Sequence, residues 1–207
     1  MQVRAFDDGG YVSVCYLVTD DKRTAAVVVD PSLSPATVRM LLGDTLPPVT
    51  AILLTHGHFD HMLELDAWRL QTRAPVCVMA ADAANLTSPL LSCYRLFLRS
   101  EQTHAAPERR LYDGDTVDVG EERLTVLATP GHTPGSVCLL ADTAIFSGDT
   151  LFQGSCGRTD LPGGDHQTIM RSLARLAALP GNLKVLPGHG SSSTMDMERR
   201  MNPFMQL

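Results

Sequence analysis

The chain has 207 residues, of which 44% are hydrophobic and 19% are charged, and this balance predicts one soluble domain over residues 1–207 with its own hydrophobic core. A formal net charge of −6 would repel a phosphate backbone, so nucleic acid is not an expected partner. The sequence shows neither a membrane-spanning apolar stretch nor a secretion signal, which predicts a cytoplasmic protein without membrane contact.

The first half of the chain alternates short apolar runs with helical patterns. Residues 11–18 and 25–29 are rich in β-branched and aromatic residues, and they predict two strands joined as a hairpin. Ser34 followed by Pro35 predicts the start of a helix, whose apolar stripe runs to Gly43. A buried strand, an amphipathic helix and a short strand are expected next, at 49–54, 62–73 and 76–78.

The second half continues with more strands and a longer helix. Residues 80–110 predict only helix and loop. Four strands are expected after them, at 115–119, 123–128, 136–140 and 143–147. A helix, a strand and a short helix are expected at 165–179, 183–186 and 194–201. Strand-rich halves flanked by helices predict an α/β fold, a mixed sandwich with helices on its outer faces.

The cysteines are odd in number and widely spaced, and three lie in apolar strand-like runs. This distribution predicts reduced and mostly buried thiols, with neither a disulfide framework nor a CxxC metal site. The positions are Cys15, Cys77, Cys93, Cys138 and Cys156.

The densest chemical signal is THGHFDH at 55–61, directly after the predicted strand 49–54. Imidazole and carboxylate groups are common ligands of zinc and similar divalent ions. On an irregular turn their alternation can direct side chains toward two neighbouring points, and Gly57 relieves the backbone crowding that this requires. The segment therefore predicts a metal site. Its donors are His56, His58, Asp60 and His61.

Three further segments repeat the pattern of an apolar strand followed by Gly and a donor side chain. The donors are His132, Asp149 and His189, after the predicted strands 123–128, 143–147 and 183–186. Loops at strand ends are where functional sites are commonly built. A lone histidine is usually a surface or structural residue, but five of the seven histidines belong to these four clusters, which favours metal binding.

The chain resembles the metallo-β-lactamase fold and, within it, small glyoxalase II-like (hydroxyacylglutathione hydrolase-like) enzymes. The motifs that carry the resemblance are HGHFDH at 56–61, GHTPGS at 131–136, FSGDTLF at 146–152 and PGHG at 187–190. They occur in order and span most of the chain. The resemblance implies an αββα sandwich with metal ions in a groove along one edge of its two sheets.

Carried over position by position, the resemblance implies two divalent metal ions, with zinc expected and iron or manganese as alternatives. The implied ligands are His56, His58 and His132 for the first ion and Asp60, His61 and His189 for the second, with Asp149 bridging the two. Asp60 and Asp149 are also the expected catalytic carboxylates.

The expected reaction is hydrolysis of a small-molecule thioester. Two such ions lower the pKa of a shared water until hydroxide exists at neutral pH, and this hydroxide is the expected nucleophile. A thiolate leaves without needing a proton, so a site that lacks an evident general acid suits a thioester. The resemblance points to S-acylglutathione-type esters. Larger family members hold glutathione with a C-terminal helical domain, whereas this chain ends 18 residues after His189, so no strong preference for glutathione is expected.

The loop at residues 154–166 resembles one that is typical of these small enzymes. In it, Arg158 is expected either to contact a substrate carboxylate or, equally, to pair with Asp160 or another nearby acid. Cys156 lies in the same loop and is predicted to be structural.

Three other functions compete with this interpretation. A persulfide dioxygenase resembles the pattern but uses one iron, held by the equivalents of His56, His132 and Asp149. The loop that carries Arg158 fits that alternative, whereas the histidine of PGHG at 187–190 favours a hydrolase. A member acting on RNA or phosphodiesters is disfavoured by the acidic charge. A metal-bound sensor or scaffold without turnover is disfavoured by the complete ligand set.

Overall fold

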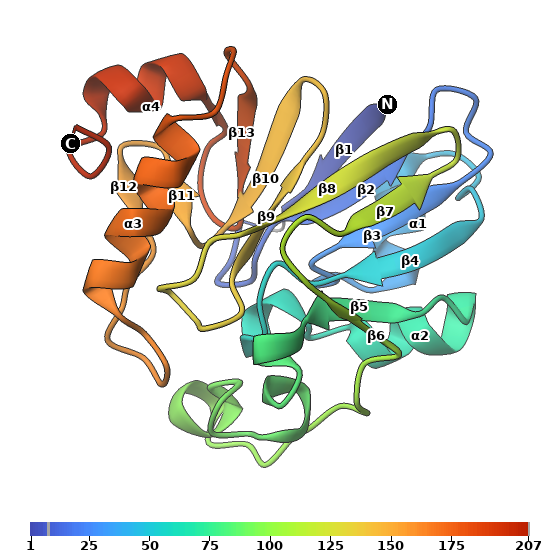
Figure 1. Cartoon of the computed structure of the whole chain (residues 1–207). Coiled ribbons are helices and arrows are strands. Elements are labelled where there is room, and N and C mark those ends of the chain that lie inside the picture. The colour runs from blue at the N-terminus through green and yellow to red at the C-terminus, as the bar shows by residue number, and fades with distance from the viewer. Residues whose placement is uncertain (8, 207) are drawn as a thin grey trace.

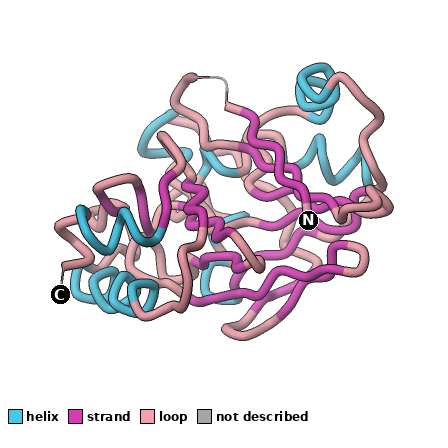
Figure 2. The backbone as a smooth tube through the Cα atoms, turned by 90° about the horizontal axis from the view of Figure 1, so that it is seen from above, coloured by secondary structure: helices cyan, strands magenta, loops and turns pink. Residues whose placement is uncertain are grey.

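The computed structural model describes residues 1–7 and 9–206, which form two six-stranded β-sheets packed face to face, with helices on both outer sides (Figure 1). Seen from above, the strands run through the middle of the molecule and the helices lie toward its outside (Figure 2). The predicted αββα sandwich is therefore confirmed. No helix in the described part of the chain combines the length and the apolar character that a membrane span requires.

The first sheet has the order β1-β2-β3-β4-β5-β6. Its strands are β1 Gln2–Phe6, β2 Cys15–Thr19, β3 Ala26–Val29, β4 Val49–Leu53, β5 Val76–Met79 and β6 Arg109–Leu111. β2 and β3 pair antiparallel as the predicted hairpin, and β3 to β6 run parallel to one another.

The second sheet has the order β14-β13-β10-β9-β8-β7. Its strands are β7 Thr116–Val119, β8 Glu122–Ala128, β9 Val137–Leu140, β10 Ala144–Gly148, β13 Lys184–Pro187 and β14 Ser193–Thr194. β10 and β13 are parallel, and the other pairs are antiparallel. A small hairpin of β11 Leu151–Phe152 and β12 Ser155–Cys156 follows β10.

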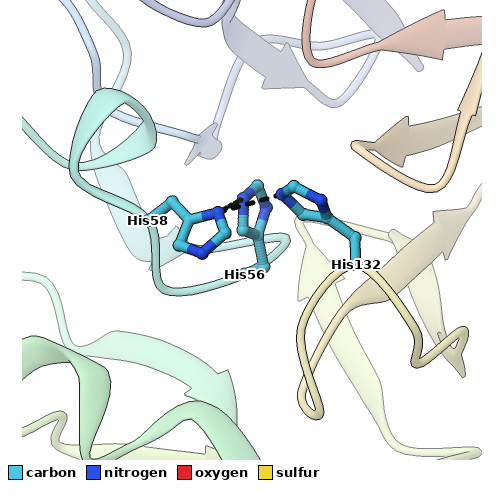
Figure 3. Close-up of side chains that lie close together, drawn as sticks. All are labelled: His56, His58 and His132. Carbon is cyan, nitrogen blue, oxygen red and sulfur yellow. Dashed lines mark hydrogen bonds between the residues drawn. The ribbon is translucent and has the colours of Figure 1, made fainter. Parts of the chain in front are cut away.

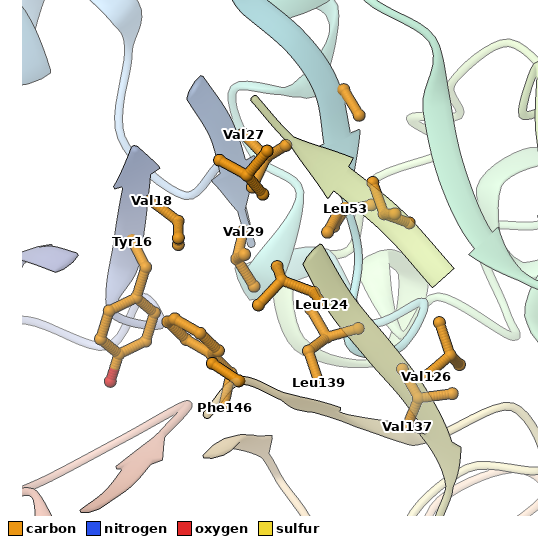
Figure 4. Packing of buried hydrophobic residues seen from close by; sticks show 14 of the residues in the cluster. Tyr16, Val18, Val27, Val29, Leu53, Leu124, Val126, Val137, Leu139 and Phe146 are labelled. Atoms are coloured by element: carbon orange, nitrogen blue, oxygen red, sulfur yellow. The ribbon is translucent and has the colours of Figure 1, made fainter. Parts of the chain in front are cut away.

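The central core lies between the two sheets and consists of the inward side chains of both (Figure 4). Tyr16 and Phe146 meet edge to face, with ring centroids 5.2 Å apart. The buried Tyr16 hydroxyl also donates a hydrogen bond of 2.7 Å to the Pro187 carbonyl. Burial of this apolar surface is the main favourable term for folding, and the hydrogen bond links β2 to the end of β13, just before His189.

Each sheet has a second core beneath its helices. α1 Pro35–Leu42 and α2 Leu65–Thr72 cover the first sheet, and each contributes a fully buried side chain to this core, Val38 from α1 and Trp68 from α2. α3 His166–Ala177 and α4 Met195–Met201 cover the second sheet through residues such as Leu173 and Met195. The Ser34 side chain accepts from the Thr37 amide at 3.1 Å, which is the predicted helix cap.

Several element boundaries differ from those that the sequence predicts. The strand expected at 11–18 begins only at Cys15, because the amides of Ser13 and Val14 donate to the carbonyls of Asp60 and Gly188 instead. The helix expected from Met62 begins at Leu65, because residues 59–61 form a 3-10 turn. The sequence patterns did not indicate the edge strands β1 and β6, since β1 is largely exposed and β6 is three residues long.

Candidate metal centre

The seven predicted donors stand on loops that follow four strands, β4, β8, β10 and β13. The structure brings all seven together, and we call them the donor cluster. Three overlapping groups have ligand atoms within 4.8 Å of one another: His56, His58 and His132; His56, His61 and Asp149; and Asp60, His61 and His189. Loops at the ends of neighbouring strands in two packed sheets meet at one edge of the sandwich, and this topology explains the convergence.

The first group is a triad of imidazoles that point at one another (Figure 3). Nδ1 of His58 lies 3.1 Å from Nε2 of His56 and 2.9 Å from Nε2 of His132. All three side chains are at most 3% exposed. Three imidazole nitrogens that converge in this way are the arrangement in which histidines bind a divalent ion.

The four other donors, Asp60, His61, Asp149 and His189, lie beside this first group; we call them the second group, and they include both carboxylates. Asp60 Oδ2 lies 3.1 Å from His189 Nε2, and Asp149 Oδ1 lies 3.3 Å from His61 Nε2. The other oxygen of Asp149 is 3.6 Å from His132 Nε2 in the first group. Asp149 therefore reaches both groups, which is the geometry required of a bridging ligand.

Three buried atoms in this cluster show that it suits metal ions. His58 Nε2, His61 Nε2 and Asp149 Oδ1 make no hydrogen bond within the described part of the chain, and the last two face each other at 3.3 Å as an ion pair. Buried polar atoms without partners are rare in native proteins and call for an explanation such as an ion. A Cβ at Gly188 would lie only 2.3 Å from Asp149 Oδ1, so glycine is required there to let the backbone approach. The donor set is suitable for a dinuclear metal site.

Burial and neighbouring charges give the two groups different protonation states in the metal-free chain. Burial lowers the pKa of His56 well below its usual value and lowers the pKa of His58 to about 3, so both rings are neutral. Burial opposes the charged forms of His61 and Asp149 too. However, Asp30 and Asp149 raise the pKa of His61, and His61 lowers the pKa of Asp149, so these two form an ion pair.

A buried carboxylate that the sequence analysis did not single out orients the second group. Asp30 lies 2.9 Å from Nδ1 of His61 and accepts from the amide and the hydroxyl of Thr55, both at 2.8 Å. Such a partner fixes the ring orientation of a metal-binding histidine. Asp30 follows the apolar strand β3 directly, so the strand-end pattern that identified the other donors could have identified it as well.

A second buried carboxylate, Asp82, joins two of the donor loops. It accepts from the amides of Gly57 and Gly135 at 2.9 and 2.6 Å, and from the Thr133 hydroxyl at 2.7 Å. It thus fixes the loop of His56 and His58 relative to that of His132. No sequence signal indicated Asp82, because it lies within a short 3-10 turn in the region predicted only as helix and loop.

Five members of the donor cluster form the floor of a pocket of about 260 Å³, namely His58, Asp60, His132, Asp149 and His189. The rest of its lining is Tyr11, Phe59, Cys93, Phe97, Arg158 and Leu161. The Arg158 side chain is half exposed and makes two hydrogen bonds to Asp160, at 2.6 and 2.7 Å. Its backbone carbonyl contacts Nδ1 of His132 at 2.7 Å. The predicted pairing with Asp160 is therefore confirmed, and contact with a substrate carboxylate stays a prediction for a residue that lines the pocket.

Comparison with known proteins gives consistent matches. The sequence model of the metallo-beta-lactamase superfamily matches residues 8–189. The probable metallo-hydrolase YqgX of Bacillus subtilis is 36% identical over 194 residues, which cover 92% of this chain and 90% of that protein. The hydroxyacylglutathione hydrolase GloC of Haemophilus influenzae is 30% identical over 197 residues, which cover 92% of each.

Solved structures with similar folds include three that are also similar in sequence. The BLEG-1 B3 metallo-beta-lactamase superimposes with a TM-score of 0.91 at 33% identity over the whole of both chains. TTHA1623 in a di-iron-bound form gives 0.81 at 36% identity, covering 93% of this chain and 94% of that one. ETHE1 from Myxococcus xanthus gives 0.78 at 30% identity, covering 98% and 84%.

Proposed function

The chain belongs to the metallo-β-lactamase superfamily, and from this membership we propose that it is a metal-dependent hydrolase of small-molecule thioesters with two zinc ions at the donor cluster. The observation that carries the proposal is the convergence of a complete donor set for two ions, five of whose members line one pocket. The 30% sequence identity to a hydroxyacylglutathione hydrolase supports a thioester as the class of substrate.

In this hydrolysis the oxygen of a water molecule bonds to the acyl carbon, the carbon–sulfur bond breaks, and a carboxylic acid and a thiol are released. When bound, two divalent ions supply Lewis acidity that activates the water and polarises the carbonyl. His56, His58 and His132 would hold the first ion, and Asp60, His61 and His189 the second, with Asp149 shared. The carboxylates of Asp60 and Asp149 line the pocket, where their oxygens can accept the proton that the water loses.

The pocket lining also supports a thioester as the substrate. Among the described residues that line it, no lysine is present and every histidine belongs to the donor cluster. A leaving group that needs protonation, such as an amine or an alkoxide, would therefore depend on the proton that Asp60 or Asp149 takes from the water. A thiolate leaves as an anion and needs none. Proximity to a fixed nucleophile and charge stabilisation then account for the rate enhancement.

The test is thiol release by protein that has been stripped of metal with a chelator and then reloaded. We expect no hydrolysis of S-lactoylglutathione or of an N-acetylcysteamine thioester by the stripped protein, and hydrolysis of both after addition of zinc or manganese. The two substrates should differ by less than about a thousandfold in kcat/KM, or ~4 kcal/mol, because the described chain shows no dedicated glutathione pocket.

Matched histidine variants control this test. His132→Ala removes a donor and should abolish thiol release, whereas His166→Ala removes an exposed histidine at the start of α3 and should not change it. A β-lactam and a persulfide serve as competing substrates, because one similar structure is described as a B3 metallo-beta-lactamase and because one-iron persulfide chemistry uses part of the same donor set. Turnover of either one without any thioester hydrolysis would overturn the proposal.

A further inference from the structure

Two stacked aromatic rings border the donor cluster and continue the pocket away from it. Phe59 lies in sequence between the donors His58 and Asp60, and it lines the pocket. Phe97 lines the pocket as well and stacks on Phe59, with ring centroids 5.6 Å apart and planes inclined by 26°. We call these two residues the aromatic wall. Because Phe59 is adjacent in sequence to His58 and Asp60, the aromatic wall places an apolar surface next to two of the donors.

The segment that carries Phe97 is a single π-helical turn over Tyr94–Leu98, fixed firmly in place. Tyr94 is fully buried, and its hydroxyl lies 2.9 Å from Nε2 of His104, whose other ring nitrogen lies 2.8 Å from Asp66. The Phe59 amide donates to the Ser92 carbonyl at 2.8 Å, which ties the turn to the donor loop. The aromatic wall is therefore preorganised.

This turn is apolar in composition but exposes more of its side chains than apolar residues usually do. Leu96, Phe97 and Leu98 are about half exposed, at 50%, 49% and 51%. Cys93 and Arg99, which flank the turn, adopt positive φ angles of 65° and 51°, a strained conformation for residues with a side chain. Adjacent exposed apolar residues on a strained turn beside a pocket are typical of ligand contacts. Phe97 is the one of the three that lines the pocket.

We propose that the aromatic wall is a subsite for the hydrocarbon chain of the acyl group, so that the preferred substrates are thioesters of medium-chain fatty acids. This inference rests on the proposed thioester hydrolysis. The reacting carbonyl must lie at the donor cluster, so the groups on either side of it are the ones that can reach Phe59. Common thiol carriers have polar amides near the sulfur, which lose hydrogen bonds against an aromatic surface. A hydrocarbon chain in the same place would bind more tightly, because the contact removes apolar surface from water.

The test uses N-acetylcysteamine thioesters that share one thiol and differ only in acyl length, from acetyl to octanoyl. The readout is the ratio of kcat/KM for octanoyl to that for acetyl, measured on metal-loaded protein. Because the ratio is taken within one variant, partial loss of metal or of folded protein cancels. We expect a ratio of about 30 or more for the unmodified chain, since each fully buried methylene contributes roughly fourfold and the aromatic wall should bury the equivalent of at least two to three of the additional methylenes.

Three variants localise the effect. Phe97→Ala should lower the ratio by about tenfold, and Phe97→Leu should restore most of it, because apolar area at this position sets the gain. Leu96→Ala is the matched control: Leu96 is equally exposed on the same turn but does not line the pocket, and the ratio should stay within about twofold of the unmodified value.

The possible outcomes separate the two proposals. Hydrolysis of all the thioesters with a ratio near one would overturn the subsite and leave the proposed function standing. An unchanged ratio in Phe97→Ala, or an equal loss in Leu96→Ala, would overturn the subsite as well. Failure to hydrolyse any thioester after metal loading would refute the proposed function and the subsite together.

Discussion

The floor and the aromatic wall of the same pocket are built in different ways. On the floor, the donors are held from behind by further contacts, such as Asp30 on His61 and the Arg158 carbonyl on His132. On the wall, Phe97 is half exposed and is held through one ring contact and the anchored turn beneath it.

This difference indicates how the two parts tolerate change. A donor on the floor cannot be altered without leaving a buried charge or ring nitrogen unpaired, which is costly. Phe97 on the wall can be replaced while the rest of the fold stays unchanged, since substitutions of exposed side chains usually have small effects on stability. We therefore expect the floor to determine whether the chain is active and the wall to determine which substrates it prefers. Four predictions test this contrast, from the largest effect to the smallest.

The largest effect is expected at Asp149, which reaches both groups of the donor cluster. Asp149→Ala should remove both metal ions and lower thioester hydrolysis by at least about a thousandfold, or ~4 kcal/mol. His61→Ala should mainly weaken binding of the second ion, because the proposed assignment makes His61 a ligand of that ion alone, although its ring lies 4.1 Å from that of His56. Elemental analysis of the purified variants measures both effects, and equal metal loss in the two would contradict the bridging assignment.

A smaller effect is expected one contact behind the floor. Asp30→Asn removes the charge that orients His61, and replacement of such partners lowers metal affinity by about 10–100-fold. The affinity for the second ion should fall more than the affinity for the first, and competition with a chromogenic chelator measures both.

Asp20→Asn is the control for that variant. Asp20 accepts from the Ala25 amide at 2.9 Å, in the loop at the far end of β2 from the donor cluster. It should leave both metal affinities unchanged. If it weakened the second ion as much as Asp30→Asn does, the loss would reflect general destabilisation rather than orientation of His61.

At the edge of the pocket, Arg158→Ala should have only a modest effect. The guanidinium is half exposed and already paired with Asp160, and exposed pairs contribute little. The KM for S-lactoylglutathione should rise by less than about threefold, or ~0.7 kcal/mol. An increase above tenfold in the steady-state KM would show instead that Arg158 binds a substrate carboxylate.

The smallest effect is expected for Cys93, which lines the pocket beside the aromatic wall. Burial raises the pKa of this thiol to about 11, so at pH 8 only about one molecule in a thousand carries the reactive thiolate. Iodoacetamide at pH 8 should leave hydrolysis unchanged, and the rate of labelling should rise about tenfold per pH unit up to the pKa. Rapid labelling at pH 8, lost in Cys93→Ala, would contradict a buried and inert thiol.

The sequence predicted the floor because the donors lie in four short motifs, each directly after an apolar strand and each containing a glycine, and because the ends of neighbouring strands meet. The spacing of apolar residues predicted the strands and helices of the sandwich, since this spacing differs clearly between a strand and a helix over five or more residues. Asp30 also follows an apolar strand, but no glycine precedes it and it lies outside the four donor motifs, so the sequence pattern indicates it less clearly. The edge strand β1 escaped prediction because its largely exposed residues carry little hydrophobic pattern.

The sequence could not predict the aromatic wall. Phe97 belongs to a five-residue π-helical turn bounded by two residues with positive φ, and no short-range pattern specifies that conformation. Its contact with Phe59 joins residues 38 positions apart and depends on tertiary packing. The sequence could not predict the role of Asp82 for the same reason, because its three hydrogen bonds reach loops that only the fold brings together.

The central claim is that the donor cluster holds two metal ions and that both are needed for thioester hydrolysis. The most direct measurement adds zinc stepwise to metal-free protein and follows thiol release from one acyl thioester. The account predicts that activity rises until about two equivalents per chain are bound and then stays constant. Full activity at one equivalent, or activity with iron alone that consumes oxygen and releases no thiol from a thioester, would contradict it.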